Sequence, residues 1–182
     1  MKMKTKYLTM CAIFAALSAV LSPISIPIGA VPINFIHISI FLAAGLLGAK
    51  YGTISQVVFV LLGTIGLPVF SGFRGGVGVI AGYTGGFIIG YIGCAFVTGI
   101  LIDRFGTGMK VLIPAMYAGW LVTYALGIMW YVFVTNTGIF AAVSACVLPF
   151  LLGDFCKTML SAVLIHRIRP ILQKGAEKAD EM

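Results

Sequence analysis

Long stretches without a charged residue restrict this sequence more than any other feature. Asp, Glu, Lys and Arg are all absent from residues 7–49, 51–73, 75–102 and 111–153. A helix that spans a membrane needs about 20 predominantly apolar residues, so these stretches have room for about five such helices. Residues 149–169 add a sixth. Because hydrophobic residues also make up 60% of the chain, we expect one all-α integral membrane domain that covers residues 1–182.

Prolines and glycines divide the apolar stretches into helices and loops. Proline lacks a backbone N–H and resists continuation of a helix, so residues 22–32, with three prolines, are predicted to form an extended outer loop. The glycine-rich residues 66–87 predict a second, irregular outer loop. The charged residues 173–182 are expected to be a flexible, unstructured tail. Helices are expected at about 7–21, 33–49, 51–67, 82–102, 111–134 and from 143 to 169.

The basic residues lie on one side of this arrangement. The net charge of +7 would suit a nucleic-acid surface only if the charges were gathered on one soluble face. Instead, of the 12 Lys and Arg residues, all but Arg74 and Lys157 fall at the termini or in turns on the same side as the termini. The positive-inside rule assigns that side to the cytoplasm. We expect a cell-membrane protein with cytoplasmic termini and no nucleic-acid partner, and with Asp103 and Arg104 solvated in a cytoplasmic turn.

Asp154 and Lys157 interrupt the last apolar segment. Three residues apart on a helix, their side chains share a face. A charge at the centre of a membrane helix costs about 2.5–3.5 kcal/mol by insertion measurements. In one interpretation the two residues only neutralise each other, and in the other they face the interior of the bundle and bind a polar substrate. An ionisable residue at membrane depth favours the second interpretation.

The glycine-rich segment is the second half of the candidate site. Irregular backbone at membrane depth is tolerated where it lines a cavity, and interrupted helices often form transporter sites. Its only charged residue, Arg74, is either an exposed arginine beside lipid headgroups or a clamp for an anionic substrate. Asn34, Tyr83 and Thr84 are further candidate polar contacts. No His, Cys or carboxylate lies at metal-ligand spacing from His37, so we expect no metal site.

Small residues mark one side of the first helix. Ala12 and Ala16 are four residues apart, as are Ala15 and Ala19, and this spacing allows a second helix to approach closely. Two interpretations fit it equally well: packing inside the protein, or a docking surface for a partner subunit.

Three groups of residues are together similar to one known family. The first is GLPVF at 66–70, followed by paired glycines at 75–76 and by TGGF at 84–87. The second is the F-x-x-G-D-x-x-K pattern of the last helix, which contains Asp154 and Lys157. The third is the pair of A-x-x-x-A spacings in the first helix. With these motifs the chain resembles, over nearly its whole length, the BioY family of biotin-specific S components of energy-coupling-factor (ECF) vitamin transporters.

The resemblance implies high-affinity capture of biotin from outside the cell. It also implies a partner module of one transmembrane coupling subunit, docked at the alanines of the first helix, and two ATP-binding subunits that hydrolyse ATP. No enzyme activity and no cofactor are implied for the chain itself. Asp154 can accept from a ureido N–H of biotin, and Lys157 or Arg74 can bind its carboxylate; which end of biotin Lys157 meets stays open.

Two places depart from the family pattern. Many members have P-x-T-x-Q after the first loop, where this chain has Asn34 in place of the threonine and Ile36 in place of the glutamine. Tyr83 stands in place of the proline of GPTGG. If the glutamine contacts the ligand in relatives, its role is vacant here or has passed to His37.

Three alternatives are weighed against biotin capture. The first is a different vitamin, such as thiamine or riboflavin, on the same fold. The second is an autonomous carrier in which Asp154 relays protons. The third is a small membrane enzyme that uses Asp154 with His37 or His166, although His166 is expected several turns away from Asp154.

Overall fold

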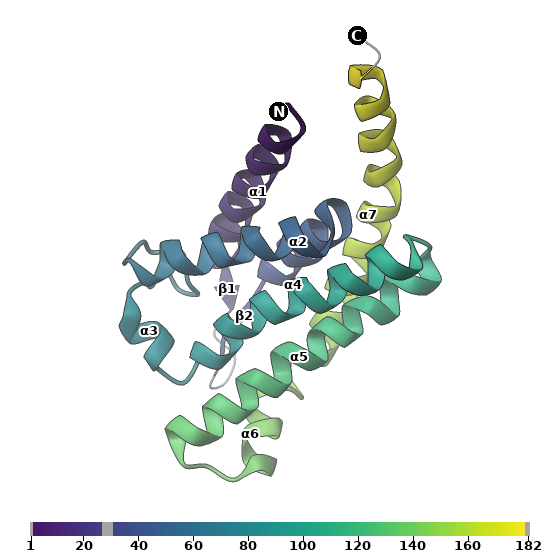
Figure 1. Ribbon diagram of the computed structural model, residues 1–182. Helices are drawn as coiled ribbons and strands as arrows, with labels where there is room; N and C mark the ends of the chain where they lie inside the picture. The colour runs from purple at the N-terminus through teal and green to yellow at the C-terminus, as the bar shows by residue number, and fades with distance from the viewer. Residues whose placement is uncertain (1, 27–30, 181–182) are drawn as a thin grey trace.

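The computed structural model describes the backbone of residues 2–26 and 31–180 and the side chains of residues 5–26 and 31–172. These residues form seven helices and two short strands, and both termini lie at one end of the molecule, away from the strands, α3 and α6 (Figure 1). The elements are α1 (Lys2–Leu21), β1 (Ser25–Ile26), β2 (Ile33–Asn34), α2 (Ile36–Thr64), α3 (Val77–Ala81), α4 (Gly85–Phe105), α5 (Met109–Thr135), α6 (Ile139–Cys146) and α7 (Leu151–Asp180).

The segment named α2 is two helical arms joined at a sharp turn. Gly48 has φ 78° and ψ −178°, a backbone conformation open essentially to glycine alone. Beyond it the chain folds back, because a Cβ atom at Gly52 would lie 2.9 Å from Cα of Ala44. In an unbroken helix these two residues would be about 12 Å apart along the axis. The arms therefore form a hairpin, as predicted by the separate helices expected at 33–49 and 51–67.

Charged side chains from two other helices bind the backbone at this turn. Asp103 of α4 accepts a hydrogen bond from the backbone N–H of Ala49 at 2.8 Å. Arg169 of α7 donates from Nη1 to the carbonyl oxygen of Gly45 at 2.9 Å. A carboxylate at the start of one helical arm and a guanidinium at the end of the other are both favoured by the helix dipole. Asp103 is exposed, as expected, and it also binds the backbone of this turn.

With its two arms counted separately, the α2 hairpin brings the helical passes among the described residues to about six. Among the described residues, α4 and α5 are each long and apolar enough to cross a membrane, and so is α2 if its two arms are counted as one segment. The pair α6 and α7, bent by 53° at its break, adds a fourth candidate if it is counted as one span, and the apolar part of α1 is shorter. Counting both arms of α2 separately, the passes agree approximately with the six expected helices. The prediction of an all-α membrane fold is confirmed.

The last helix extends further than the composition predicts. It begins after a bend at residues 147–150, which include Pro149. It then continues to Asp180 through residues expected to be unstructured. Gln, Lys, Ala and Glu between 173 and 180 are good helix formers, and adding residues to a formed helix is easier than starting a new one.

Glycines bring the central helices into close contact. A Cβ atom at Gly99 of α4 would lie 2.6 Å from the backbone nitrogen of Ala49, and one at Gly90 would lie 3.0 Å from Cα of Thr123 on α5. A side chain at Gly99 would collide with the backbone of α2, and one at Gly90 would be tightly crowded by the backbone of α5. The backbone of α4 is therefore held directly against α2 on one side and against α5 on the other.

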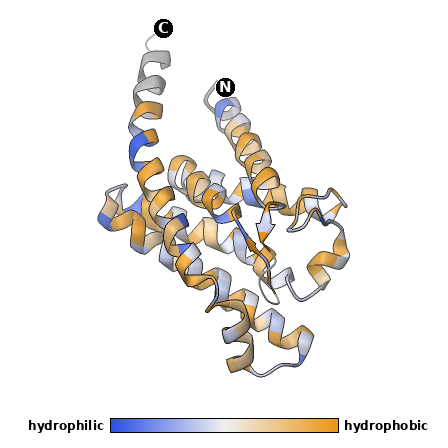
Figure 2. Cartoon of the chain, turned by 180° about the vertical axis from the view of Figure 1, so that it is seen from behind, coloured by the Kyte–Doolittle hydropathy of each residue, from blue (hydrophilic) through white to orange (hydrophobic). Residues whose placement is uncertain are grey.

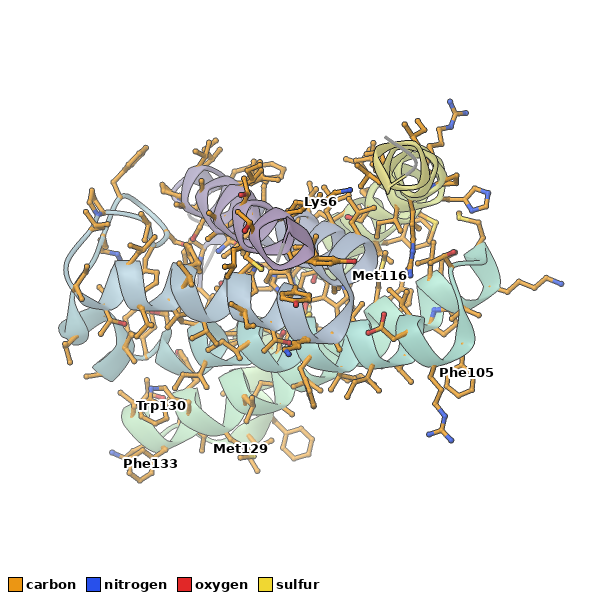
Figure 3. The ribbon with its side chains drawn as sticks, turned by 45° about the horizontal axis from the view of Figure 1, so that its top comes forward. Lys6, Phe105, Met116, Met129, Trp130 and Phe133 are labelled. Atoms are coloured by element: carbon orange, nitrogen blue, oxygen red, sulfur yellow. The ribbon has the colours of Figure 1, made fainter. Side chains whose placement is uncertain are left out.

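The outer surface of the bundle is largely apolar. Hydrophobic residues cover most of the helices, and hydrophilic ones are evident near the N-terminus and in the coloured part of α7 (Figure 2). Phe105, Met129 and Phe133 project from the edges of the bundle, whereas Met116 lies inside it (Figure 3). A soluble protein would bury such residues, so this surface suits contact with lipid.

Candidate functional site

Asp154 and Lys157 form an ion pair inside the bundle. The two residues are 5% and 6% exposed, and Nζ of Lys157 lies 3.0 Å from Oδ1 of Asp154. Asp154 is in the first turn of α7, where the backbone N–H groups favour a negative charge. The hydroxyl of Tyr124, on α5, donates a hydrogen bond to Oδ2 of Asp154. The pair therefore faces the interior and not the lipid.

A stack of aromatic rings lies beside the ion pair. The indole of Trp120 is nearly parallel to the imidazole of His37, with centroids 3.7 Å apart, and to the phenol ring of Tyr124, at 5.5 Å. Nζ of Lys157 lies 5.6 Å from the centroid of the Trp120 ring, within the range of a cation–π contact. Nε1 of Trp120 donates to the hydroxyl of Thr158 at 3.1 Å, which links α5 to α7 and sets the position of the indole.

The ion pair and the aromatic stack line a first cavity of about 380 Å³, including the space at its mouth. Most of its wall is apolar or aromatic, with a small number of polar groups that converge on the interior. Pockets for small molecules typically have this composition. Its other lining residues are Val31, Pro32, Ile33, Asn34, Phe87, Tyr91, Thr123, Cys146 and Phe150.

A second cavity of about 350 Å³, again including the open space at its mouth, adjoins the first. The two share Asn34 and Tyr91 among their lining residues. The amide of Asn34 donates to the hydroxyl of Tyr91 at 3.2 Å and to the hydroxyl of Ser71 at 2.9 Å. Arg74 and Thr84 line the second cavity but not the first. The hydrogen bonds of Asn34 thus lie at the boundary between the two spaces.

Arg74 lies on a tight turn anchored by an aromatic residue. The backbone N–H of Phe70 donates to the carbonyl of Arg74 at 2.9 Å, and the reverse bond measures 3.3 Å. Phe70, from the GLPVF motif, is 2% exposed and packs edge-on against Phe59 with centroids 5.8 Å apart. Nε of Arg74 donates to the carbonyl of Ser71. Among the described residues the single ion pair is Lys157–Asp154, so no carboxylate there balances Arg74.

Tyr83 does not join the other candidate residues. It is 38% exposed and lines neither cavity. Its ring packs edge-on against Tyr131, with centroids 6.3 Å apart. The neighbouring Thr84 does line the second cavity. Both residues lie in the turn that precedes α4, which begins at Gly85.

The alanines of α1 divide between two faces. Ala12 and Ala16 are exposed, whereas Ala15 is 2% exposed and belongs to the core. Ala19 is partly buried. Ala12 and Ala16 are therefore the pair that faces outward, whereas Ala15 packs inside the protein. That the outward pair binds a partner stays a prediction.

Sequence reasoning missed several groups that complete the site. The predicted site residues do not include Tyr124, which donates to Asp154, or Tyr91 and Ser71, which accept from Asn34. These hydrogen bonds join residues 30 to 57 positions apart in the chain. No local spacing indicates such pairs, because they depend on how separate helices are rotated against one another.

The geometry does not favour the enzyme alternative. His166 is exposed and lines neither cavity, so it does not converge on Asp154. Within the described residues, no group of three His, Cys, Asp or Glu side chains is placed to hold a metal ion. The charges, hydrogen-bonding groups and aromatic walls are arranged to bind a small, partly polar molecule.

Comparisons with known proteins agree with this arrangement. A sequence model described as the BioY family matches residues 1–174. A biotin transporter BioY from Thermotoga maritima is 38% identical over 166 residues, which are 91% of this chain and 97% of that protein. A probable biotin transporter BioY from Pyrococcus horikoshii is 37% identical over 167 residues, 92% of this chain and 98% of that one. A crystal structure of the S-component for biotin from an ECF-type ABC transporter has a TM-score of 0.83, with 32% identity and 93% of both chains covered.

Proposed function

The chain belongs to the BioY family, and we propose on this premise that it is the biotin-binding S component of a vitamin uptake transporter of the energy-coupling-factor type. The observation that carries the proposal is the buried Asp154–Lys157 pair, which lines an aromatic cavity in a fold shared with an S-component for biotin. Biotin needs an acceptor for its ureido N–H groups, an apolar wall for its ring and a cation for its carboxylate, and the two cavities contain all three.

Charge balance suggests how biotin lies across the two cavities. Asp154 and Lys157 neutralise each other, so the first cavity suits the neutral ureido ring, with Asp154 accepting from an N–H. Arg74 suits the carboxylate, because a guanidinium can bind both carboxylate oxygens at once. Val31 and Phe87 line both cavities and would contact the apolar chain between the two ends of biotin. Asn34 and Thr84 are the further polar contacts that we propose.

Partner subunits supply the energy in this proposal. The chain has no G-x-x-x-x-G-K-[ST] motif for binding a nucleotide phosphate, so ATP hydrolysis is assigned to two ATP-binding subunits joined to a transmembrane coupling subunit. The exposed Ala12 and Ala16 of α1 are proposed as the surface that contacts the coupling subunit. The distribution of the basic residues supports the proposal that both termini lie in the cytoplasm of a cell-membrane protein, by the positive-inside rule.

Equilibrium binding of radiolabelled biotin to purified protein tests the site. Asp154→Asn and Lys157→Ala are each expected to weaken binding at least about tenfold, because a hydrogen bond to a charged group contributes about 1.5–3 kcal/mol and about 1.4 kcal/mol is tenfold in affinity. Lys110→Ala, at an exposed lysine, is the matched control and should bind normally. Unchanged binding in both site variants would exclude this site.

Loss of folding must be separated from loss of binding in these variants. Removing one partner of a buried ion pair leaves an unbalanced charge and destabilises a protein by about 3–5 kcal/mol. The double variant Asp154→Asn/Lys157→Met removes both charges and is expected to be more stable than either single variant, yet still to bind weakly. Thermal unfolding in detergent and gel filtration check that it is folded.

Two further measurements separate the alternatives. Competition by biotin, thiamine and riboflavin identifies the vitamin, and biotin is expected to compete at the lowest concentration. Uptake by cells that lack the partner module distinguishes an autonomous carrier from an S component. Uptake that persists there and stops with an uncoupler would favour a proton-coupled carrier with Asp154 as the relay.

A further inference from the structure

His37 is a buried polar side chain that none of the described residues satisfies. It is 5% exposed, and neither Nδ1 nor Nε2 has a hydrogen-bond partner among the described residues. Buried polar groups are almost always hydrogen-bonded, and an exception calls for a physical explanation. His37 also lines the first cavity, together with Asp154 and Lys157.

Three aromatic rings hold the imidazole in place. It lies flat against Trp120 at 3.7 Å and meets Tyr91 at an angle of 89° at 5.2 Å, and Phe41 lies at 6.1 Å. His37 is in the first turn of α2, which begins at Ile36. Packing therefore fixes the ring without using either nitrogen, and the cavity is where an unpaired nitrogen can find a partner.

The imidazole of His37 can donate a hydrogen bond to the ureido carbonyl of biotin, a bond that the carboxylate of Asp154 cannot supply because it only accepts. A neutral imidazole offers one N–H donor and one acceptor nitrogen. If the ureido ring lies beside Asp154, the carboxylate accepts from a ureido N–H, and the ureido carbonyl between the two N–H groups still needs a donor. Lys157 uses one of its three N–H donors on Asp154, whereas neither nitrogen of His37 has a partner among the described residues.

We propose that His37 is a specificity-determining residue that donates a hydrogen bond to the ureido carbonyl of biotin. The inference rests on the proposed function and deepens it, because it assigns a second contact to the same ring. Asp154 and His37 then recognise adjacent atoms of the ureido group from α7 and α2. A ligand without a carbonyl at this position leaves the donor of His37 unpaired and binds less well.

Two variants of His37 separate its polar role from its packing role. His37→Phe keeps a ring against Trp120 but has no donor, and His37→Gln keeps a donor and an acceptor but no ring. We expect His37→Phe to bind biotin about tenfold more weakly or worse, and His37→Gln to recover most of that affinity. Desthiobiotin, which retains the ureido group, should follow biotin in both variants.

The decisive measurement is selectivity for the carbonyl. In 2-iminobiotin an imine replaces the ureido carbonyl, and when protonated near neutral pH it no longer accepts a hydrogen bond. The unmodified protein should therefore prefer biotin strongly over 2-iminobiotin, and His37→Phe should lose most of that preference. Selectivity here is the ratio of the affinities for biotin and for 2-iminobiotin, measured on one folded preparation. A purely structural role of His37 would change both affinities alike and leave their ratio the same. If His37→Phe does not fold, His37→Leu replaces it in the same comparison.

The outcomes distinguish this inference from the function on which it rests. Failure of the unmodified protein to bind biotin would overturn the proposed function. Normal binding by the unmodified protein, with unchanged affinity and selectivity in His37→Phe, would overturn the role of His37 alone. Loss of selectivity in His37→Phe and its recovery in His37→Gln would support the role.

Discussion

Lys157 and Arg74 both line the cavities, and they differ in what balances their charge. Nζ of Lys157 lies 3.0 Å from a carboxylate oxygen of Asp154, whereas no described carboxylate pairs with Arg74. Arg74 is also exposed, and within the described part of the chain its guanidinium makes one hydrogen bond, from Nε to the carbonyl of Ser71. Its remaining N–H groups suit a carboxylate brought by the ligand.

Arg74→Gln is expected to weaken the binding of biotin about fivefold. The effect is modest because an ion pair at an exposed site contributes at most about 1 kcal/mol. Biotin amide, which has no negative charge, should bind the variant and the unmodified protein equally. Arg104→Gln, at another exposed arginine, is the control. An equal loss for biotin and for its amide would contradict the assignment of the carboxylate to Arg74.

At the scale of elements, the hairpin of α2 depends on one glycine and on charges from two other helices. Gly48 has φ 78°, and a Cβ atom placed there would lie 2.8 Å from both carboxylate oxygens of Asp103. Asp103 binds the start of the second arm and Arg169 the end of the first. The turn therefore joins α2 to α4 and α7 at the end of the bundle opposite the cavities.

Gly48→Ala is expected to lower the stability of the protein by about 1–3 kcal/mol, the cost of a non-glycine residue in such a conformation. It should also displace the carboxylate of Asp103. The midpoint of thermal unfolding in detergent measures the effect. Gly108→Ala is the matched control, because Gly108 has φ −64° and a Cβ atom there meets nothing within 4 Å. Equal midpoints for the two variants would show that the turn is not strained.

At the scale of the whole molecule, one pair of alanines is placed to serve assembly. Ala12 and Ala16 are exposed on α1 beside Leu8 and Val20, which are 60% and 62% exposed. Ala15 faces the core instead. A surface of small residues lets a neighbouring helix approach closely, and lipid alone would not require it.

Ala12→Leu/Ala16→Leu is expected to abolish most biotin uptake by cells that contain the coupling module, because the larger side chains keep a partner helix at a distance. Binding of biotin to the purified variant should be unchanged, since neither residue lines a cavity. Ala125→Leu, at an exposed alanine of α5, is the control. Normal uptake by the double variant would exclude this face as the docking surface.

Much of the fold was predictable because a bilayer imposes strong local rules. Charge-free stretches and proline or glycine breaks locate the passes. Lys50, which separates two charge-free stretches, predicts a boundary two residues from the turn at Gly48. The interior position of Asp154 and Lys157 also followed from the cost of exposing charge to lipid. By contrast, α7 extends through a segment whose composition predicted an unstructured tail. The composition of that segment carries no information about the helix that already exists before it in the chain.

The sequence by itself determined the membrane class, the approximate number of passes and the presence of a buried acid–base pair, because each depends on which residues can face hydrocarbon. Only the tertiary structure decided which side chains meet. It placed Tyr124 against Asp154, His37 against Trp120, and Tyr83 outside both cavities. These contacts depend on the rotation of each helix about its axis and on the close approach that glycines allow. Both are set by packing between segments far apart in the chain.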